Sequence, residues 1–126
     1  MLLGELDVGF PWGVLVLTDQ RSTEEIPSWV SDEDQVTHSS TAAVVRVRHQ
    51  DEGEVIVRVW DDDSEVRGGL AFAASLDLES GVLKVSDALG DAVLQIPLVR
   101  GPIGVRIYTD SAVEATQVDL VVTQGS

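Results

Sequence analysis

Apolar and polar residues alternate with a period of two along most of this chain, and helical periodicity is nearly absent. In the segment 41–50, Val45 and Val47 share one face while Arg46 and Arg48 share the other. The pattern predicts about nine strands, separated by turn-forming residues. They cover residues 3–8, 12–19, 41–50, 54–60, 69–78, 82–87, 92–98, 104–110 and 117–123.

A series of short strands without intervening helices is typical of an antiparallel β-sandwich. We therefore expect a single all-β domain over residues 1–126. The glycine-containing, acidic connections at 51–53 and 79–81 predict two β-hairpins. Residues 19–40 form a long stretch without strand periodicity, and we expect an ordered irregular loop there, anchored by Trp29.

Charge changes this picture more than any motif does. The chain carries 22 acidic and 8 basic side chains, a formal net charge of −14 and a pI near 4.1. Nucleic acid and anionic membranes would be repelled, whereas a basic protein partner would be attracted and steered. There is no cysteine, no signal-peptide pattern and no apolar run of membrane length, so a cytoplasmic, bacterial location is expected.

The densest acidic segment follows the strand predicted over 54–60. Four acids occur within five positions: Asp61, Asp62, Asp63 and Glu65. Acids at alternate positions resemble the start of a calcium-binding loop, but Val66 and Phe72 stand where an EF-hand needs its glycine and its bidentate glutamate. An EF-hand is therefore excluded. A looser calcium site between sandwich loops and a solvated anionic turn remain as alternatives.

No residue pattern points to catalysis or to a cofactor. The chain has no GxSxG, GxGxxG or GxxxxGK motif, and His38 and His49 lie in separate polar segments. Among 22 acids a pair suited to glycoside hydrolysis could occur by chance, and aromatic residues, at 5%, do not single one out. We expect no catalytic residue, no metal and no cofactor, and an enzyme that uses carboxylates is the weakest alternative.

The order of segments along the chain carries further information. A strand pair, ELDVGFPWGVLVLTD, precedes an irregular segment with a tryptophan, IPSWVSDEDQV. AAVVRVRHQDEGEVIVRVWDDD and LAFAASLDLESGVLKVSD follow, and AVLQIPLVRGPIGVRIYT and QVDLVV close the chain. Over nearly its whole length this layout resembles the competence protein ComJ family, whose members inhibit a DNA-entry nuclease. The resemblance implies an inhibitor rather than an enzyme.

Resemblance and charge together predict a non-enzymatic acidic binding protein, an inhibitor or immunity-type partner of a basic enzyme such as a nuclease. Carboxylates can occupy the basic cleft in which a nuclease grips phosphates. The predicted contact residues are acids of the turn and of the long loop, with two aromatic anchors: Asp61, Asp62, Asp63, Glu65, Asp32, Glu33, Asp34, Trp29 and Trp60. Solvated acids and packed rings are the alternative roles. A calcium- or small-ligand-binding sandwich module is the alternative function.

Overall fold

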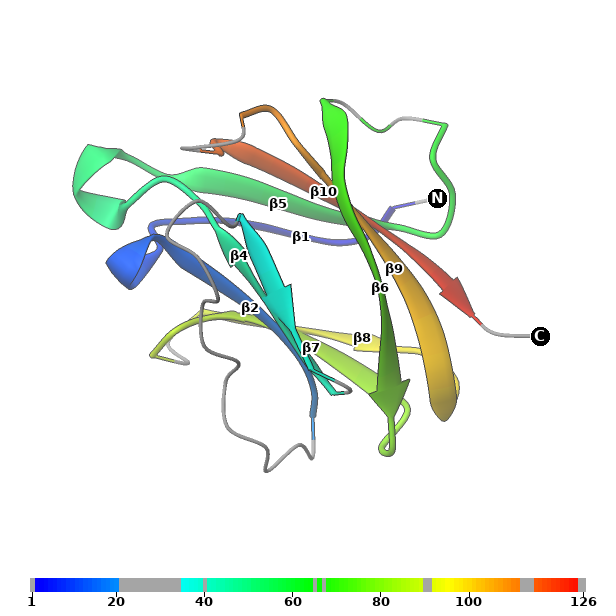
Figure 1. Cartoon of the computed structure of the whole chain (residues 1–126). Coiled ribbons are helices and arrows are strands. Elements are labelled where there is room, and N and C mark those ends of the chain that lie inside the picture. Colours follow the sequence, from blue (N-terminus) through cyan, green and yellow to red (C-terminus); the bar gives the residue numbers. More distant parts are fainter. Residues whose placement is uncertain are drawn as a thin grey trace.

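The computed structural model describes residues 2–20, 35–39, 41–64, 66, 68–89, 92–111 and 115–124. In this part of the chain ten strands form two five-stranded sheets (Figure 1). The first sheet, in spatial order, consists of β1 (Leu2–Val8), β5 (Val55–Trp60), β10 (Gln117–Gln124), β9 (Gly101–Thr109) and β6 (Gly69–Leu78). The second consists of β3 (Val36–His38), β4 (Ala42–Arg46), β2 (Val14–Asp19), β7 (Val82–Asp87) and β8 (Val93–Pro97).

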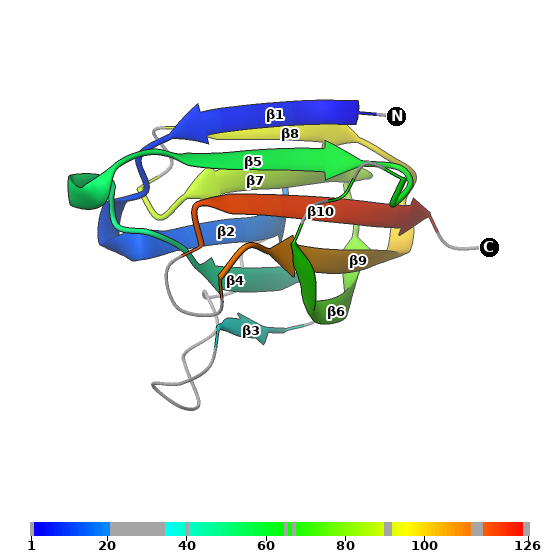
Figure 2. The same cartoon turned by 90° about the horizontal axis from the view of Figure 1, so that it is seen from above.

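The two sheets stack face to face, with β1, β5, β10 and β9 lying in front of β8, β7, β2 and β4 in Figure 2. Alternate residues of each strand point into the space between the sheets, because successive side chains of a strand lie on opposite faces. Val55, Val57 and Val59 of β5 are fully buried there, and Leu15 and Leu17 of β2 meet them from the second sheet. Burial of these side chains is the main favourable contribution to folding.

The predicted fold class is confirmed: the chain is an all-β, mostly antiparallel sandwich. The predicted strands at 69–78 and 82–87 have the bounds of β6 and β7. One strand more than expected is present, because the short β3 lies inside the stretch predicted to be irregular. The described helical elements are two 3-10 turns of three residues, η1 (Pro11–Gly13) and η2 (Gln50–Glu52), and no described helix is long enough to cross a membrane.

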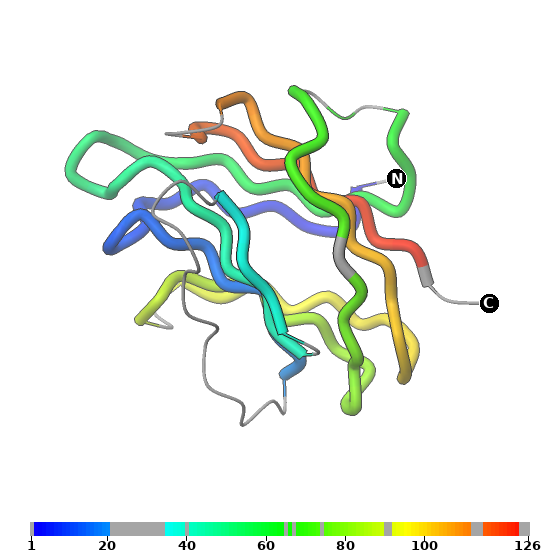
Figure 3. The backbone as a smooth tube through the Cα atoms, in the orientation of Figure 1, coloured from blue at the N-terminus to red at the C-terminus, as the bar shows by residue number. Residues whose placement is uncertain are grey.

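Both predicted hairpins are wrong. Strands β4 and β5, on either side of residues 51–53, belong to different sheets, as do β6 and β7 on either side of residues 79–81. Figure 3 shows the chain passing from one layer to the other at both places. A short turn with glycine reverses the chain whether the next strand pairs within the sheet or packs across the sandwich, so local sequence does not distinguish the two.

Buried and half-buried aspartates hold several of these connections in place. The Asp19 carboxylate, 2% exposed, accepts hydrogen bonds from the Ser80 backbone N–H at 3.1 Å and from its hydroxyl at 2.6 Å. This contact ties the end of β2 to the connection between β6 and β7. Asp87 similarly accepts from the backbone N–H groups of Leu89 and Ala92, at 3.1 and 3.3 Å, and closes the β7–β8 hairpin.

Replacement of Asp19 by alanine should lower the free energy of unfolding by about 1–3 kcal/mol, since two partly buried donors of Ser80 lose their acceptor. Urea denaturation should show a lower midpoint with an unchanged slope. The matched control is Asp77→Ala at an exposed position of β6, which we expect to change stability by less than about 0.5 kcal/mol. Equal losses in the two variants would contradict a capping role for Asp19.

Asp110 makes the stability depend on pH in the acid range. Partial burial by itself raises the pKa of its carboxyl, but hydrogen bonds from Thr116 and Gln117 outweigh this effect, and the pKa lies below its ordinary value. A carboxyl whose pKa is lower in the folded than in the unfolded chain stabilises the fold above the unfolded pKa, and this contribution disappears as pH falls through the folded pKa.

The Asp110→Asn variant should therefore have a lower Tm than the wild type above about pH 4, and the difference should shrink toward zero on further acidification. Thermal denaturation followed by circular dichroism from neutral to strongly acidic pH measures it. Asp77→Asn is the control, because Asp77 is exposed. A difference between Asp110→Asn and wild type that stays constant across this range would rule out the proposed linkage.

Candidate protein-contact surfaces

The acidic turn belongs to an unusual connection. Strands β5 and β10 are parallel, while β10 pairs antiparallel with β9 and β9 with β6, so β5 and β6 run in the same direction. Two strands, β10 and β9, lie between the end of β5 and the start of β6, so a crossover joins β5 to β6. Parallel strands usually need roughly a dozen residues or more for such a crossover. The short connection keeps the acidic turn close to the sheet.

A row of paired residues on the outer face of the sheet shows where the turn lies. Trp60 of β5 is opposite Val121 of β10, and Val121 is opposite Arg106 of β9. The Asp63 carboxylate lies 3.5 Å from the Arg106 guanidinium, so the chain folds back across this row within three residues of Trp60. The ion pair is half exposed and contributes little stability, but it marks where the turn lies.

Asp61, Asp62 and Asp63 are all exposed, as the sequence predicts for an anionic surface. Asp62 accepts hydrogen bonds from the Ser64 hydroxyl at 2.8 Å and from the Ser64 backbone N–H at 3.2 Å. These bonds lower the pKa of the Asp62 carboxyl below its ordinary value, so it is ionised at neutral pH. The turn therefore presents ordered carboxylates, and that of Asp63 pairs with Arg106.

Trp60 does not lie on the surface. Its side chain is 7% exposed, and its indole N–H donates to the carboxylate of Asp119 at 2.9 Å. Asp119 is itself 1% exposed and also accepts from the Gln117 amide at 3.3 Å. Trp60 therefore has the alternative role, that of a packed ring. A buried indole with a satisfied N–H contributes to stability rather than to contact with a partner. We do not include Trp60 in the contact surface.

The other predicted contact residues lie outside the described residues: Trp29, Asp32, Glu33, Asp34 and Glu65. Their grouping with the acidic turn remains a prediction. Three further exposed acids, Asp51, Glu52 and Glu54, precede β5, whereas the acidic turn follows it. Exposed carboxylates therefore occur at both ends of this strand and not only in the acidic turn.

The sequence pattern places Trp12 at the start of the strand predicted over 12–19 and gives it no role of its own. The side chain is 69% exposed, the largest exposed fraction among the large apolar residues that the structure describes. The sequence feature that indicates this exposure is the tripeptide Pro11-Trp12-Gly13, which forms η1 rather than the start of a strand. Proline and glycine on either side of a residue are typical of a turn, where a side chain points away from the core.

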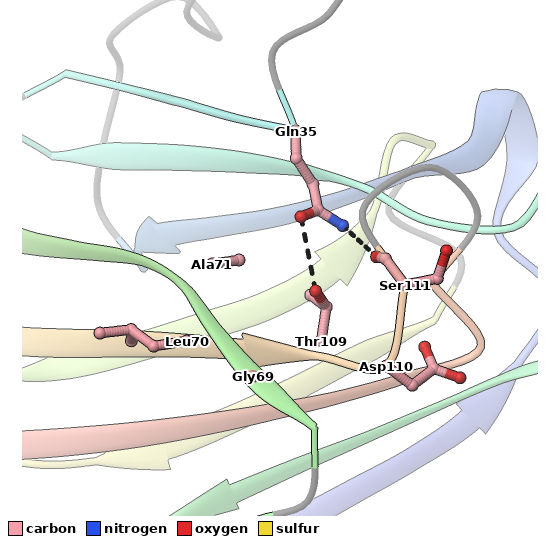
Figure 4. Close-up of a pocket in the computed structure, with 7 residues that line it drawn as sticks. All are labelled: Gln35, Gly69, Leu70, Ala71, Thr109, Asp110 and Ser111. Carbon is pink, nitrogen blue, oxygen red and sulfur yellow. Dashed lines mark hydrogen bonds between the residues drawn. The ribbon is translucent and has the colours of Figure 1, made fainter.

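The alternative of a calcium- or ligand-binding module gains no support from the described geometry. Across the described residues, no group of three or more histidine and acidic side chains could hold a metal ion. A shallow pocket of about 240 Å³ lies beside β6, lined by Gln35, Gly69, Leu70, Ala71, Thr109, Asp110 and Ser111 (Figure 4). The Gln35 amide donates to the Ser111 carbonyl at 2.6 Å and accepts from the Thr109 hydroxyl at 3.4 Å. Both polar atoms of the Gln35 side chain therefore already have partners within the pocket wall.

Comparison with known proteins identifies the fold. No family model and no curated protein sequence matches the chain. The solved structure of ComJ, inhibitor of the DNA degrading activity of NucA, from Bacillus subtilis, superimposes with a TM-score of 0.76 at 10% identity, covering 99% of this chain and 98% of that one. A protein described as crocagin biosynthetic gene J gives a TM-score of 0.59 at 12% identity, with 97% and 96% covered. The chain therefore has a ComJ-like sandwich fold.

Proposed function

We propose that this chain is a non-enzymatic acidic protein that binds and inhibits a basic nuclease. The observation that carries the proposal is the likeness to ComJ over 99% of the chain, since ComJ is an inhibitor of a DNA-degrading nuclease. Fold alone does not determine function, and the charge of this chain supplies independent support. A formal net charge of −14 suits a partner whose own substrate is a polyanion.

The physical basis of the inhibition is competition for a basic cleft. A nuclease holds the phosphate backbone with lysine and arginine side chains, and carboxylates of the inhibitor pair with the same side chains. In this proposal the exposed carboxylates of Asp61, Asp62 and Asp63 present part of that anionic surface. Because the attraction acts over long distances, it accelerates encounter more than it slows dissociation.

The first test identifies the partner and the activity together. The immobilised chain is used to capture proteins from a native lysate of its source at low and high salt, and retained proteins are identified by mass spectrometry. Each retained nuclease, and purified NucA, is then assayed for DNA degradation with increasing amounts of the chain. We expect a basic nuclease that is retained at low salt, released at high salt and inhibited in solution. If none of these nucleases is inhibited, the proposed function is wrong.

Lysine substitutions test the contribution of the acidic turn. The triple variant Asp61→Lys, Asp62→Lys, Asp63→Lys should associate with the inhibited nuclease roughly tenfold more slowly at low salt, with a weaker dependence of the on-rate on salt. Surface plasmon resonance at several salt concentrations measures both rates. The matched control, Asp7→Lys, Asp77→Lys, Glu79→Lys, changes the net charge equally at exposed positions away from the turn. Equal slowing in the two variants would show that net charge, rather than the turn, steers association.

A further inference from the structure

Trp12 is exposed in a way that the fold does not require. Its immediate neighbours are buried: Phe10 is fully inaccessible, and Pro11 and Gly13 are buried within η1. The indole ring itself remains 69% exposed and lies outside the apolar core between the sheets. Tryptophan supplies a large apolar surface when it is covered, and this position leaves most of that surface in water. The ring therefore contributes little to the stability of the free chain.

The backbone of Trp12 adds to the cost of having tryptophan at this position. Its φ of 62° and ψ of 6° lie in the left-handed region, and it is the one non-glycine residue with a positive φ among the described residues. A residue with a Cβ is disfavoured there by about 1–2 kcal/mol, whereas glycine and asparagine adopt this conformation more readily. Residues held in disfavoured backbone conformations cluster at functional positions, where the surrounding structure maintains the strain.

The turn that carries Trp12 is held rigidly. The Phe10 carbonyl accepts from the N–H groups of Gly13 and Gln50, at 3.0 and 3.1 Å, and the Gly13 carbonyl accepts from Val47 at 2.9 Å. The approach to Val47 is so close that a Cβ at Gly13 would lie 2.8 Å from its carbonyl oxygen. A side chain on a fixed backbone loses little conformational entropy when a partner binds, which favours affinity.

Carboxylates flank this turn. The η1 turn packs against η2, and both project from the same end of the sandwich in Figures 1 and 2. Three exposed acids lie in and after η2: Asp51, Glu52 and Glu54. The Asp51 side chain is 83% exposed, and its carboxylate lies 3.5 Å from Nδ1 of His49. Three acids in and after the neighbouring 3-10 turn oppose an anionic lipid surface, nucleic acid and a second copy of this acidic chain. They complement the lysine and arginine side chains of a basic protein.

We propose that Trp12, together with Asp51, Glu52 and Glu54, forms the anchor of the interface with a basic protein partner. An arginine or lysine of the partner stacks on the indole face and pairs with the adjacent carboxylates. The inference rests on the proposed inhibitor function and names the surface that it uses. The acidic turn, at the far end of β5, then contributes mainly to the rate of encounter, while Trp12 determines the rate of dissociation.

The stability of the free chain provides a test that needs no partner. Asparagine tolerates the left-handed conformation, so Trp12→Asn should have a Tm equal to or higher than that of the wild type. The control is Trp12→Phe, which keeps a ring and the disfavoured backbone and should leave the Tm unchanged. A Tm lowered by several degrees in Trp12→Asn would show that the ring stabilises the fold, and would overturn its assignment as a binding residue.

Binding kinetics provide the second test, using a nuclease that the wild-type chain inhibits. Trp12→Asn should dissociate at least tenfold faster with little change in the on-rate, and Trp12→Phe should be intermediate. The matched control is Val99→Ala, which removes an apolar side chain that is 50% exposed elsewhere and should bind as the wild type does. Reversal of Asp51, Glu52 and Glu54 to lysine should also accelerate dissociation.

The outcomes separate the two proposals. If the wild type inhibits a nuclease but Trp12→Asn dissociates from it at the wild-type rate, the Trp12 surface is not the interface and the inhibitor function stands. If the wild type inhibits no nuclease, the inhibitor function fails, and the Trp12 surface fails with it as a nuclease-binding site. Faster dissociation in Trp12→Asn at an unchanged Tm supports both.

Discussion

Burial of one apolar face of each sheet against the other is the interaction on which the rest of this structure depends. The side chains that meet between the sheets are fully buried, including those of Val55, Val57 and Val59 on one side and Leu15 and Leu17 on the other. This contact has to offset the mutual repulsion of a chain with a net charge of −14, because self-repulsion disfavours any compact state. The acids are consequently excluded from the space between the sheets and occupy strand ends, turns and outer faces.

The acids do not all serve the same purpose. Asp19 and Asp87 are buried acceptors for turn N–H groups, and Asp119 accepts from the indole of Trp60 on the outer face of the first sheet. These carboxylates act within the fold, since a buried carboxylate is tolerated only with hydrogen-bond partners. The exposed acids, which include those at the two ends of β5, lie on the surface that a protein partner would reach. Net charge therefore overstates the anionic surface that such a partner would meet.

The two described tryptophans differ in exposure, and Trp60, the aromatic anchor expected from the sequence, is the buried one. Trp60 is the last residue of the alternating strand β5 and lies opposite Val121 on the outer face of the sheet. Trp12, by contrast, is exposed in a strained turn at the other end of the sandwich. The short β5–β6 crossover accounts for the first, because it brings the chain back over the outer face beside Trp60. The fixed η1 turn accounts for the second, since it leaves the ring 69% exposed and outside the core between the sheets.

Sequence by itself determined the all-β class, most strand positions and the acidic character, because two-residue alternation and charge are local properties of the chain. The bounds of β6 and β7 followed directly from it. Only tertiary structure decided which sheet each strand joined, that β5 and β10 run parallel, and which tryptophan is exposed. These features depend on contacts between residues far apart in the chain, and a turn such as 51–53 has the same local chemistry whether it closes a hairpin or crosses between layers.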